Sequence, residues 1–325
     1  MSNMDTGLLG MRHFYKPFQY PWAFEYMKLQ HQARWLPISI PMADDIMDFN
    51  GKLTKQEKNL ITQVLRFFTQ GDIEVQNNYM TRLSSVFVLP EVASMLAAFA
   101  SIETIHVWAY SYLNESLKFP ESEYSAFMEI EAMRNKYEYL KQFKVSTQAE
   151  IAKTLAVFGG FMEGVQLFGS FAILMNFPRR NLLKNVGQII SWSIKDESLH
   201  SKAICHLFRA FITEHPHLWR GEKGREFKKE LYDICRTMVE LEDKFIDKCF
   251  ELGPVEGLTA DQIKQYIRYI ADVRLGDLGL KTNYNIAENP LPWLDIMVNA
   301  KEHGNFFETH PVDYAEGVIT DDWEP

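Results

Sequence analysis

The sequence reads 101-SIETIHVWAY-110 in one long apolar stretch and 196-DESLH-200 in another, and both segments contain the pattern Glu-x-x-His. Residues three apart lie on one face of an α-helix, with Cβ atoms about 5–6 Å apart, so the carboxylate and imidazole of a pair can bind one metal ion. One such pair is weak evidence, because Glu and His often meet at this spacing by chance. Two pairs in apolar stretches are much stronger evidence. The pairs are Glu103 with His106 and Glu197 with His200.

The rest of the chain has a helical pattern nearly throughout. Good helix formers fill long windows, and the alternation of apolar and polar residues that is typical of strands is rare. Thr54, with Glu57 three residues later, predicts a helix start with a capping box, and Pro178 predicts a helix end. The predicted helices cover about 54–86, 90–113, 121–143, 148–177, 182–213, 224–252 and 259–275.

These helices predict an all-α, ferritin-like bundle with a dinuclear metal site between four helices. In that pattern two helices each supply a Glu-x-x-His pair and two others each supply an acid. No Gly/Ser linker or abrupt change in composition divides the chain. We expect an irregular N-terminal segment over 1–40, a helical domain over 41–300 and a flexible acidic tail over 301–325.

An acid precedes each Glu-x-x-His pair at a similar separation. Asp72 lies 31 residues before Glu103, and Glu163 lies 34 residues before Glu197. Two antiparallel helices joined by a short loop would bring each acid level with its pair. Glu163 is also the only ionisable residue between Lys153 and Arg179. A carboxylate in so apolar a helix costs on the order of several kcal/mol unless it is paired or bound to metal. The alternative is a buried Glu163 paired with a distant Arg.

Asp72 competes with Glu74 as the acid of its helix. The inward stripe, with spacings of three and four, reads Ile61, Val64, Leu65, Phe68, Asp72, Val75 and Tyr79. Asp72 lies on this stripe and Glu74 lies off it, so we expect Asp72 to face the core and Glu74 to be solvated. The alternative for Asp72 is a helix-interior acid bonded to a neighbouring helix.

The chemistry of these ligands favours iron or manganese. Four carboxylates and two imidazoles provide hard oxygen ligands with one nitrogen per metal, whereas zinc prefers tetrahedral sites rich in sulfur or nitrogen. Tyr110 follows His106 by four residues and Glu103 by seven, so it lies on the metal-facing side, one turn beyond. Spacing alone does not distinguish a tyrosine that serves the metal site from a core tyrosine with a hydrogen-bonded hydroxyl.

Composition excludes several other classes of function. The 325 residues carry a net charge of −9 without a basic block, so nucleic-acid binding is not expected. The N-terminus lacks the apolar core of a signal peptide. The run 154–178 contains Glu163, Gln166 and Asn176, so it offers no clean membrane span. The cysteines have neither a zinc spacing nor a disulfide pattern, which is typical of a reducing cytosol; they are Cys205, Cys235 and Cys249.

At the residues quoted above, the sequence resembles the small, radical-generating subunit of class I ribonucleotide reductase. The resemblance covers about residues 20–316, which is most of the chain. Other dinuclear carboxylate proteins share the ligands but not usually the late Pro-Trp and Phe-Phe-Glu elements. The segments that carry it are 101-SIETIHVWAY-110, 196-DESLH-200, 288-ENPLPWLD-295 and 302-EHGNFFE-308.

The resemblance implies a role for each candidate residue. Asp72, Glu103 and His106 would bind one metal ion, and Glu163, Glu197 and His200 the other, with one or more carboxylates bridging. After reaction of the reduced pair with an oxidant, Tyr110 would lose one electron and store a radical. An iron pair is favoured, with a manganese pair or a mixed pair as alternatives.

The resemblance also implies a transfer path and partners. The radical would move from Tyr110 past His106 to Asp196 and Trp35, with Tyr314 as the relay in the tail. A large catalytic subunit would hold the nucleotide. The family's habit is a homodimer, and a flavoprotein that supplies the oxidant is a further candidate partner. We expect a cytoplasmic protein that contacts neither nucleic acid nor membrane.

The C-terminal tail has physical features that suit docking. Residues 311–325 carry five acids and no base, and acid-rich ends of this kind are often disordered until bound. Ile319 and Trp323 could insert into a groove of a partner. The alternative is a tail that only aids solubility. For the whole chain, the rival functions are an oxidase or oxygenase that acts on a small organic substrate, and a metal-storage or helical scaffold protein.

Overall fold

The computed structural model describes residues 7–297, and its regular elements are helices. The α-helices are α1 Pro21–Gln32, α2 Ala43–Gly51, α3 Lys55–Asn77, α4 Ser84–Val86, α5 Pro90–Ser116, α6 Glu123–Ala126, α7 Glu131–Lys141, α8 Gln148–Leu155, α9 Leu167–Arg179, α10 Lys184–Glu214, α11 Gly221–Cys249 and α12 Ala260–Asp277. The segments η2 Asn78–Leu83 and η3 Ala156–Gln166 are π-helical, and η1 Pro37–Ser39 and η4 Pro216–Leu218 are 3-10 turns. The predicted all-α class is confirmed.

The start of α3 follows the predicted capping box. The backbone N–H of Glu57 donates to Thr54 Oγ1 at 3.2 Å, and the backbone N–H of Thr54 donates to Glu57 Oε2 at 2.8 Å. These bonds satisfy two amides that have no partner inside the helix. From here α3 continues through η2 and α4 to Val86, the predicted end.

Three local features differ from the sequence-based expectation. Helix α1 lies inside 1–40, which we expected to be irregular, because Pro21 occupies a first-turn position where proline is tolerated. Helix α2 is an additional element. The predicted helix over 121–143 is instead two helices, α6 and α7, separated by a turn at 127–130.

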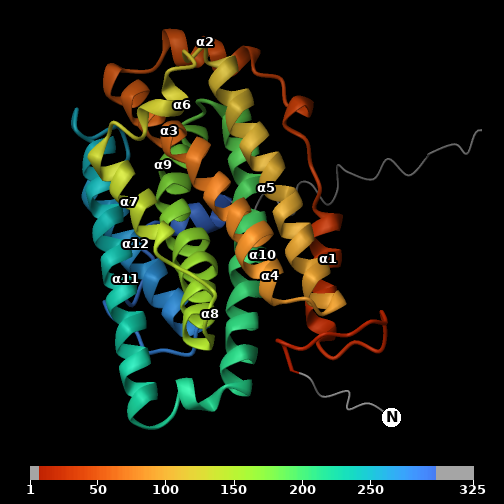
Figure 1. The fold of residues 1–325 in the computed structure, drawn as a ribbon. Coiled ribbons are helices and arrows are strands. Elements are labelled where there is room, and N and C mark those ends of the chain that lie inside the picture. Colours follow the sequence, from red (N-terminus) through yellow and green to blue (C-terminus); the bar gives the residue numbers. More distant parts are fainter. Residues whose placement is uncertain (1–6, 298–325) are drawn as a thin grey trace, which may run out of the picture. The chain divides into compact units, whose positions relative to one another are not determined.

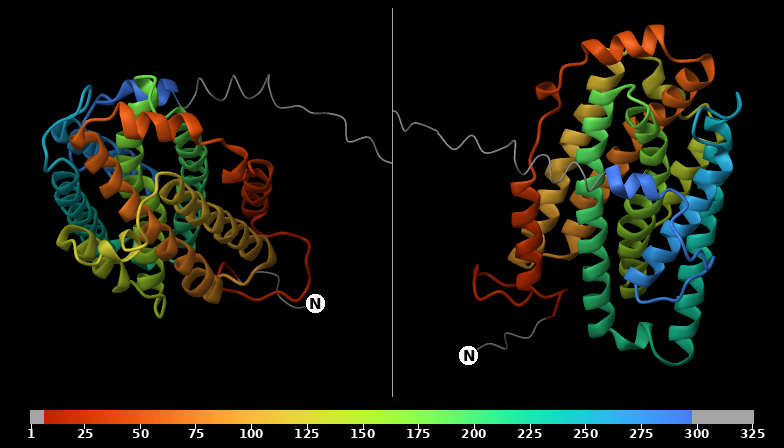
Figure 2. Two further views of the ribbon diagram at one scale, coloured as in Figure 1. Left: turned by 90° about the horizontal axis from the view of Figure 1, so that it is seen from above. Right: turned by 180° about the vertical axis from the view of Figure 1, so that it is seen from behind.

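Four helical rods form the centre of the bundle. They are α3 with its extension, α5, the continuous run α8–η3–α9, and α10. Helix α3 packs on α5, and α10 packs on η3 and α9. Figure 1 shows α1 outside α5 on one side of this core, and α11 with α12 on the other; Figure 2 shows the same order from above and behind. The four rods therefore enclose the space where the predicted ligands lie.

Two glycines allow η3 to pack very closely on its neighbours. A Cβ atom at Gly159 would lie 2.4 Å from Ile204 Cβ on α10, and one at Gly164 would lie 2.7 Å from Ser201 Oγ on the same helix. A side chain at Gly159 would force η3 and α10 apart, and one at Gly164 would displace the side chains of Ser201 and Arg274. The backbone beside Glu163 is therefore held against α10.

The most apolar helices are explained by the core. Pro90–Ser116 and the continuous run Gln148–Arg179 are long and apolar enough to cross a membrane by length and composition. The most apolar window of Gln148–Arg179 is completely buried inside the protein, whereas that of Pro90–Ser116 is 56% buried. The run Gln148–Arg179 is thus a core helix, whereas α5 (Pro90–Ser116) keeps part of its apolar surface exposed. A second compact unit begins at Pro292, and its described residues, 292–297, are helical.

Candidate metal centre

The six predicted metal-binding residues meet in the middle of the bundle. Each side chain is at most 1% exposed. Because each Glu-x-x-His pair lies within one helix, its carboxylate and imidazole point in the same direction. Helix α3 contributes Asp72, α5 contributes Glu103 and His106, η3 contributes Glu163, and α10 contributes Glu197 and His200.

Two carboxylates lie between the two imidazoles. Glu103 Oε2 is 3.3 Å from His106 Nδ1, and Glu103 Oε1 is 3.1 Å from His200 Nδ1. Glu197 has the same arrangement, at 3.0 Å from His106 Nδ1 and 3.6 Å from His200 Nδ1. Carboxylates placed in this way can bridge two metal ions. The potential ligand atoms fall into two groups, each within 4.8 Å: Glu103, Glu163, Glu197 and His200, and Asp72, Glu103 and His106.

The buried polar atoms of this cluster lack the hydrogen bonds that a protein interior normally provides. Both carboxylate oxygens of Asp72 and of Glu103 have no hydrogen-bond partner, nor do the Nδ1 atoms of the two histidines. The contacts between Nδ1 and the carboxylates are short but are not aligned as hydrogen bonds. Buried acceptors without donors are costly, and cations at the centre of the cluster would satisfy them. The residues present therefore fit a dinuclear metal site.

The outward nitrogens of the two histidines fix their tautomers. His106 Nε2 lies 3.1 Å from Asp196 Oδ2, and His200 Nε2 lies 2.9 Å from Gln30 Oε1. An ionised carboxylate and an amide oxygen only accept hydrogen bonds, so each Nε2 carries the proton and donates. Each Nδ1 then presents a lone pair to the cluster, as a metal ligand must.

The concentration of acids shifts the ionisation of the cluster. Burial raises the pKa of Asp72 well above its usual value, and the charge of Glu103 adds to this effect. Burial also raises the pKa of Glu163 to about 8, although the contact with His200 and its charge oppose the shift. Burial lowers the pKa of His200, but the close contacts of its Nδ1 with the surrounding carboxylates, Glu103 first, outweigh this effect and raise the pKa well above normal. Burial among other acids thus disfavours the ionised form of Asp72 and Glu163 in the metal-free protein, and bound dications would favour that form.

Comparison with known proteins identifies the family. The family model described as "Ribonucleotide reductase, small chain" matches residues 12–290. The chain belongs to the ribonucleotide reductase small-chain family. It is 39% identical to a probable ribonucleoside-diphosphate reductase small subunit of Invertebrate iridescent virus 3, over 97% of this chain and 88% of that protein. It is 37% identical to the corresponding protein of Invertebrate iridescent virus 6, over 97% of each chain.

Solved structures agree on the fold of this reductase subunit. The R2 subunit of ribonucleotide reductase from Clostridium botulinum superposes with a TM-score of 0.79 at 22% identity, covering 86% of this chain and 89% of that one. The dimanganese(II)-NrdF protein of Streptococcus sanguinis gives a TM-score of 0.74 at 21% identity, covering 85% of this chain and 94% of that one. The family match and the iridescent-virus relatives show that the chain has the function of a ribonucleoside-diphosphate reductase small subunit, which implies partnership with the large subunit. The oxidase and storage alternatives are set aside.

Asp196 connects the reductase cluster to Trp35. Its Oδ2 atom accepts a hydrogen bond from Trp35 Nε1 at 2.8 Å and lies 3.1 Å from His106 Nε2, while its Oδ1 atom accepts from Gln30 Nε2 at 2.9 Å. The Trp35 ring also stacks on the His106 ring, with centroids 5.8 Å apart. The structure therefore brings these two predicted transfer residues together around a metal-cluster histidine.

Tyr110 is buried on the side of the cluster where Asp72 lies. It is 1% exposed, and its ring stacks on Phe68 with centroids 4.5 Å apart. Burial raises the pKa of Tyr110 well above its usual value, the negative charge of Asp72 raises it further, and a hydrogen bond with Ser193 acts in the opposite direction. A dry, aromatic environment of this kind protects a phenol from solvent.

Two contact residues were missed by the sequence reasoning, and one expectation was wrong. Gln30 contacts His200 from a helix 170 residues away, and no local pattern marks it. Tyr79 donates to Glu163 and does carry a signal, since it belongs to the inward stripe of Asp72. Glu74, which we expected to be solvated, is buried because α7 packs against this side of α3. Tyr314 lies outside the described residues.

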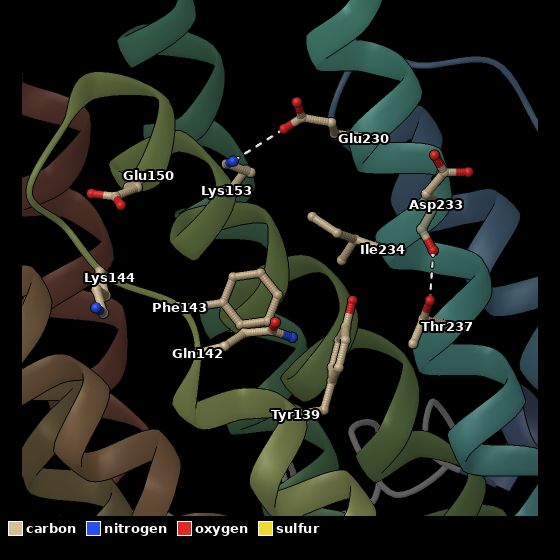
Figure 3. Close-up of a pocket in the computed structure, with 10 residues that line it drawn as sticks. All are labelled: Tyr139, Gln142, Phe143, Lys144, Glu150, Lys153, Glu230, Asp233, Ile234 and Thr237. Carbon is tan, nitrogen blue, oxygen red and sulfur yellow. Dashed lines mark hydrogen bonds and ion pairs between the residues drawn. The ribbon is translucent and has the colours of Figure 1, made fainter.

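One hollow on the described surface is unrelated to the cluster. A cavity of about 350 Å³ lies between the end of α7, α8 and α11, as Figure 3 shows. Its rim includes an ion pair of Lys153 with Glu230 at 3.0 Å, and the hydroxyl of Thr237 donates to the Asp233 carbonyl at its edge. None of the six cluster residues lines it.

Proposed function

We propose that this subunit generates and stores a tyrosyl radical at Tyr110 and passes it to a large subunit that reduces ribonucleotides to deoxyribonucleotides. The observation that carries the proposal is the buried cluster itself, with unpartnered carboxylate oxygens and two inward Nδ1 atoms. Asp72, Glu103 and His106 form one ligand group, and Glu163, Glu197 and His200 form the other. The position of Glu103 in both potential groups supports a bridging role.

The metal pair, once oxidised, supplies the one-electron oxidising power of this reaction. The residues of the chain hold the pair and exclude water. Tyr110 gives up the electron, and its burial against Phe68 keeps the resulting radical away from solvent. The electron hole then leaves through His106, Asp196 and Trp35, which are linked by hydrogen bonds of 3.1 and 2.8 Å.

Iron is the metal that we propose for both positions, with a manganese pair or a mixed pair as alternatives. The ligand set of oxygens with one nitrogen per ion suits either metal. The similar Streptococcus sanguinis structure is described as a dimanganese(II) protein, which supports the manganese alternative on this fold. Metal analysis of protein purified from cells grown with both metals would decide between them.

The partners follow from the sequence and from exposed surface. We assign docking on the large subunit to the acidic tail 311–325, with Tyr314 as its relay; both lie outside the described residues. Deletion of 312–325 should leave metal and radical intact and abolish turnover, and full turnover without the tail would contradict this role. We place the subunit in the cytoplasm, where a flavoprotein could supply the oxidant.

A homodimer would cover the apolar surface that α1, η1 and α5 leave exposed. Leu29, Ile38 and Trp108 are 49%, 61% and 40% exposed, and large apolar side chains gathered on neighbouring elements are typical of an interface. Sedimentation velocity should give a dimer for the full chain and a shift toward monomer for a variant with Ile38→Asp and Trp108→Ser. A monomeric parent chain would contradict this proposal.

Electron paramagnetic resonance tests the central claim. The full chain, loaded with ferrous iron and exposed to dioxygen, should give a tyrosyl signal that is lost in Tyr110→Phe with unchanged iron content. Tyr266→Phe is the matched control, because Tyr266 is 2% exposed but lies on α12, away from the cluster, and it should keep the signal. A tyrosyl signal that survives in Tyr110→Phe would remove Tyr110 from its assigned role.

A further inference from the structure

A second buried tyrosine touches the cluster directly. Tyr79 is 1% exposed, and its hydroxyl donates to Glu163, with distances of 2.6 Å to Oε1 and 2.9 Å to Oε2. The ring is held by edge-to-face contacts, with centroids 5.8 Å from Phe99 and 5.9 Å from His200. The two rings and the hydrogen bond together hold the hydroxyl toward the carboxylate.

Glu163 is the carboxylate of the cluster whose direction the protein itself fixes. Asp72 and Glu103 have no hydrogen bond on either oxygen, and Glu197 Oε2 has none. Both oxygens of Glu163, by contrast, lie within hydrogen-bond distance of one donor. When a bound metal ion keeps Glu163 ionised, this hydrogen bond is about twice as strong as one between neutral groups. The Tyr79 contact therefore restricts the rotation of the Glu163 carboxylate more than any contact restricts its counterpart Asp72.

The position of Tyr79 follows from the geometry of α3. It lies seven residues, or nearly two helical turns, after Asp72, so both side chains project from one face about 10 Å apart along the axis. The helix becomes π-helical at Asn78, immediately before Tyr79. Glu163 lies in the other π-helical segment, η3. Such widened turns are frequent at functional sites. One helical rod thus serves both metal positions, with a carboxylate at one and a phenol at the other.

We propose that Tyr79 is a positioning residue for Glu163, holding its carboxylate in the orientation that the metal position beside His200 requires and making the two metal positions unequal. This inference rests on the ligand set proposed above. It predicts that loss of the phenol hydroxyl weakens binding at one position and spares the position formed by Asp72, Glu103 and His106.

Manganese(II) titration of the metal-free full chain tests this proposal. The parent protein should bind two ions, and electron paramagnetic resonance should show the spectrum of a spin-coupled pair. In Tyr79→Phe the weaker-binding ion should lose affinity by about 10–100-fold, a range typical of groups that orient metal ligands. At one equivalent the spectrum should be that of an isolated ion. Tyr112→Phe is the control, because it removes a comparable hydroxyl bond, to Ile40 O at 2.7 Å, far from the ligands.

The outcomes separate this proposal from the ligand set on which it rests. If the parent protein does not bind two ions, the ligand set is wrong. If the parent binds two and Tyr79→Phe has the same isotherm and coupled spectrum, the role of Tyr79 is wrong. An equal weakening of both ions, with a lower melting temperature of the metal-free protein, would show a merely structural role.

A second variant keeps the test decisive if Tyr79→Phe does not fold. p-Aminophenylalanine at position 79 retains the ring and a weaker donor in place of the hydroxyl. Affinity for the weaker-binding ion should then fall below that of the parent protein, because the amino group donates more weakly than the hydroxyl, while the tighter-binding ion keeps its affinity. An isotherm identical to that of the parent protein would overturn the proposal.

Discussion

His106 and His200 occupy matching positions in the two halves of the cluster, yet their outward nitrogens meet different groups. His106 Nε2 contacts the Asp196 carboxylate at 3.1 Å, whereas His200 Nε2 contacts the amide oxygen of Gln30 at 2.9 Å. A carboxylate carries charge and can take up a proton, but a side-chain amide does neither near neutral pH. His106 therefore contacts the partner of Trp35 directly, whereas His200 reaches the same carboxylate only through the amide of Gln30.

The acids of the two halves also differ in their contacts. Asp72 has no hydrogen bond on either oxygen, while Glu163 is held by Tyr79. The backbones beside Asp72 and Glu163 also differ in how closely they are packed. A Cβ atom added at Gly71 would meet the flexible end of the Met162 side chain, whereas one added at Gly159 would meet the Cβ atom of Ile204. One sequence motif, used twice, thus produces an adaptable half and a rigid half, because the residues packed behind each copy are different.

The largest expected effect comes from the carboxylate that the two halves share. Glu103→Ala should abolish tight binding of both ions, because Glu103 contributes to both ligand groups. Glu163→Ala should lose one ion and keep the other, because Glu163 belongs to one group only. Metal content by mass spectrometry after dialysis, at equal protein concentration, measures both. If Glu103→Ala retains two ions, Glu103 is not a ligand that the two halves share. Unchanged metal content in Glu163→Ala would remove Glu163 from the ligands.

Asp196→Asn should separate metal binding from radical transfer. The amide can still accept from Trp35 and His106, but the negative charge is lost and its NH2 group would face Gln30 Nε2, which is also a donor. We expect turnover with the large subunit to fall by about 10–100-fold, as for other groups that orient a metal-bound histidine. The tyrosyl signal per metal pair, measured in the same samples, should change little. Full turnover in Asp196→Asn would show that the charge of this carboxylate is not needed.

Local signals in the sequence were sufficient for most of the long helices and for the grouping of the six candidate residues. Thr54 and Glu57 predicted the start of α3 because a capping box is formed by neighbours in the chain. The separations of 31 and 34 residues singled out Asp72 and Glu163, since antiparallel helices convert a separation in sequence into a level in the bundle. The structure brings both acids to the cluster, although their role as ligands stays a proposal.

Features that depend on packing could not be predicted. Glu74 lies off the inward stripe of α3, and it is buried only because α7 covers that side. Gln30 reaches His200 across 170 residues, so no window of sequence contains the contact. Pro21 lies in the segment that we expected to be irregular, but it begins α1. The π-helical turns, which set the directions of Tyr79 and Glu163, have no sequence signal of their own.

The smallest of the three effects concerns the rigidity of the half around Glu163. Gly159→Ala should destabilise the metal-free protein by about 1–3 kcal/mol, because the new Cβ atom would lie 2.4 Å from Ile204 Cβ and force η3 and α10 apart. Gly71→Ala is the matched variant in the half around Asp72. Its Cβ atom would lie 3.3 Å from Met162 Cε, the end of a flexible side chain, and alanine gains about 1 kcal/mol over glycine inside a helix. Thermal unfolding of both variants should therefore give a clear loss for Gly159→Ala and little change or a gain for Gly71→Ala. Equal melting temperatures would mean that the two halves are equally adaptable, and the difference between their carboxylates would then rest on the hydroxyl of Tyr79 alone.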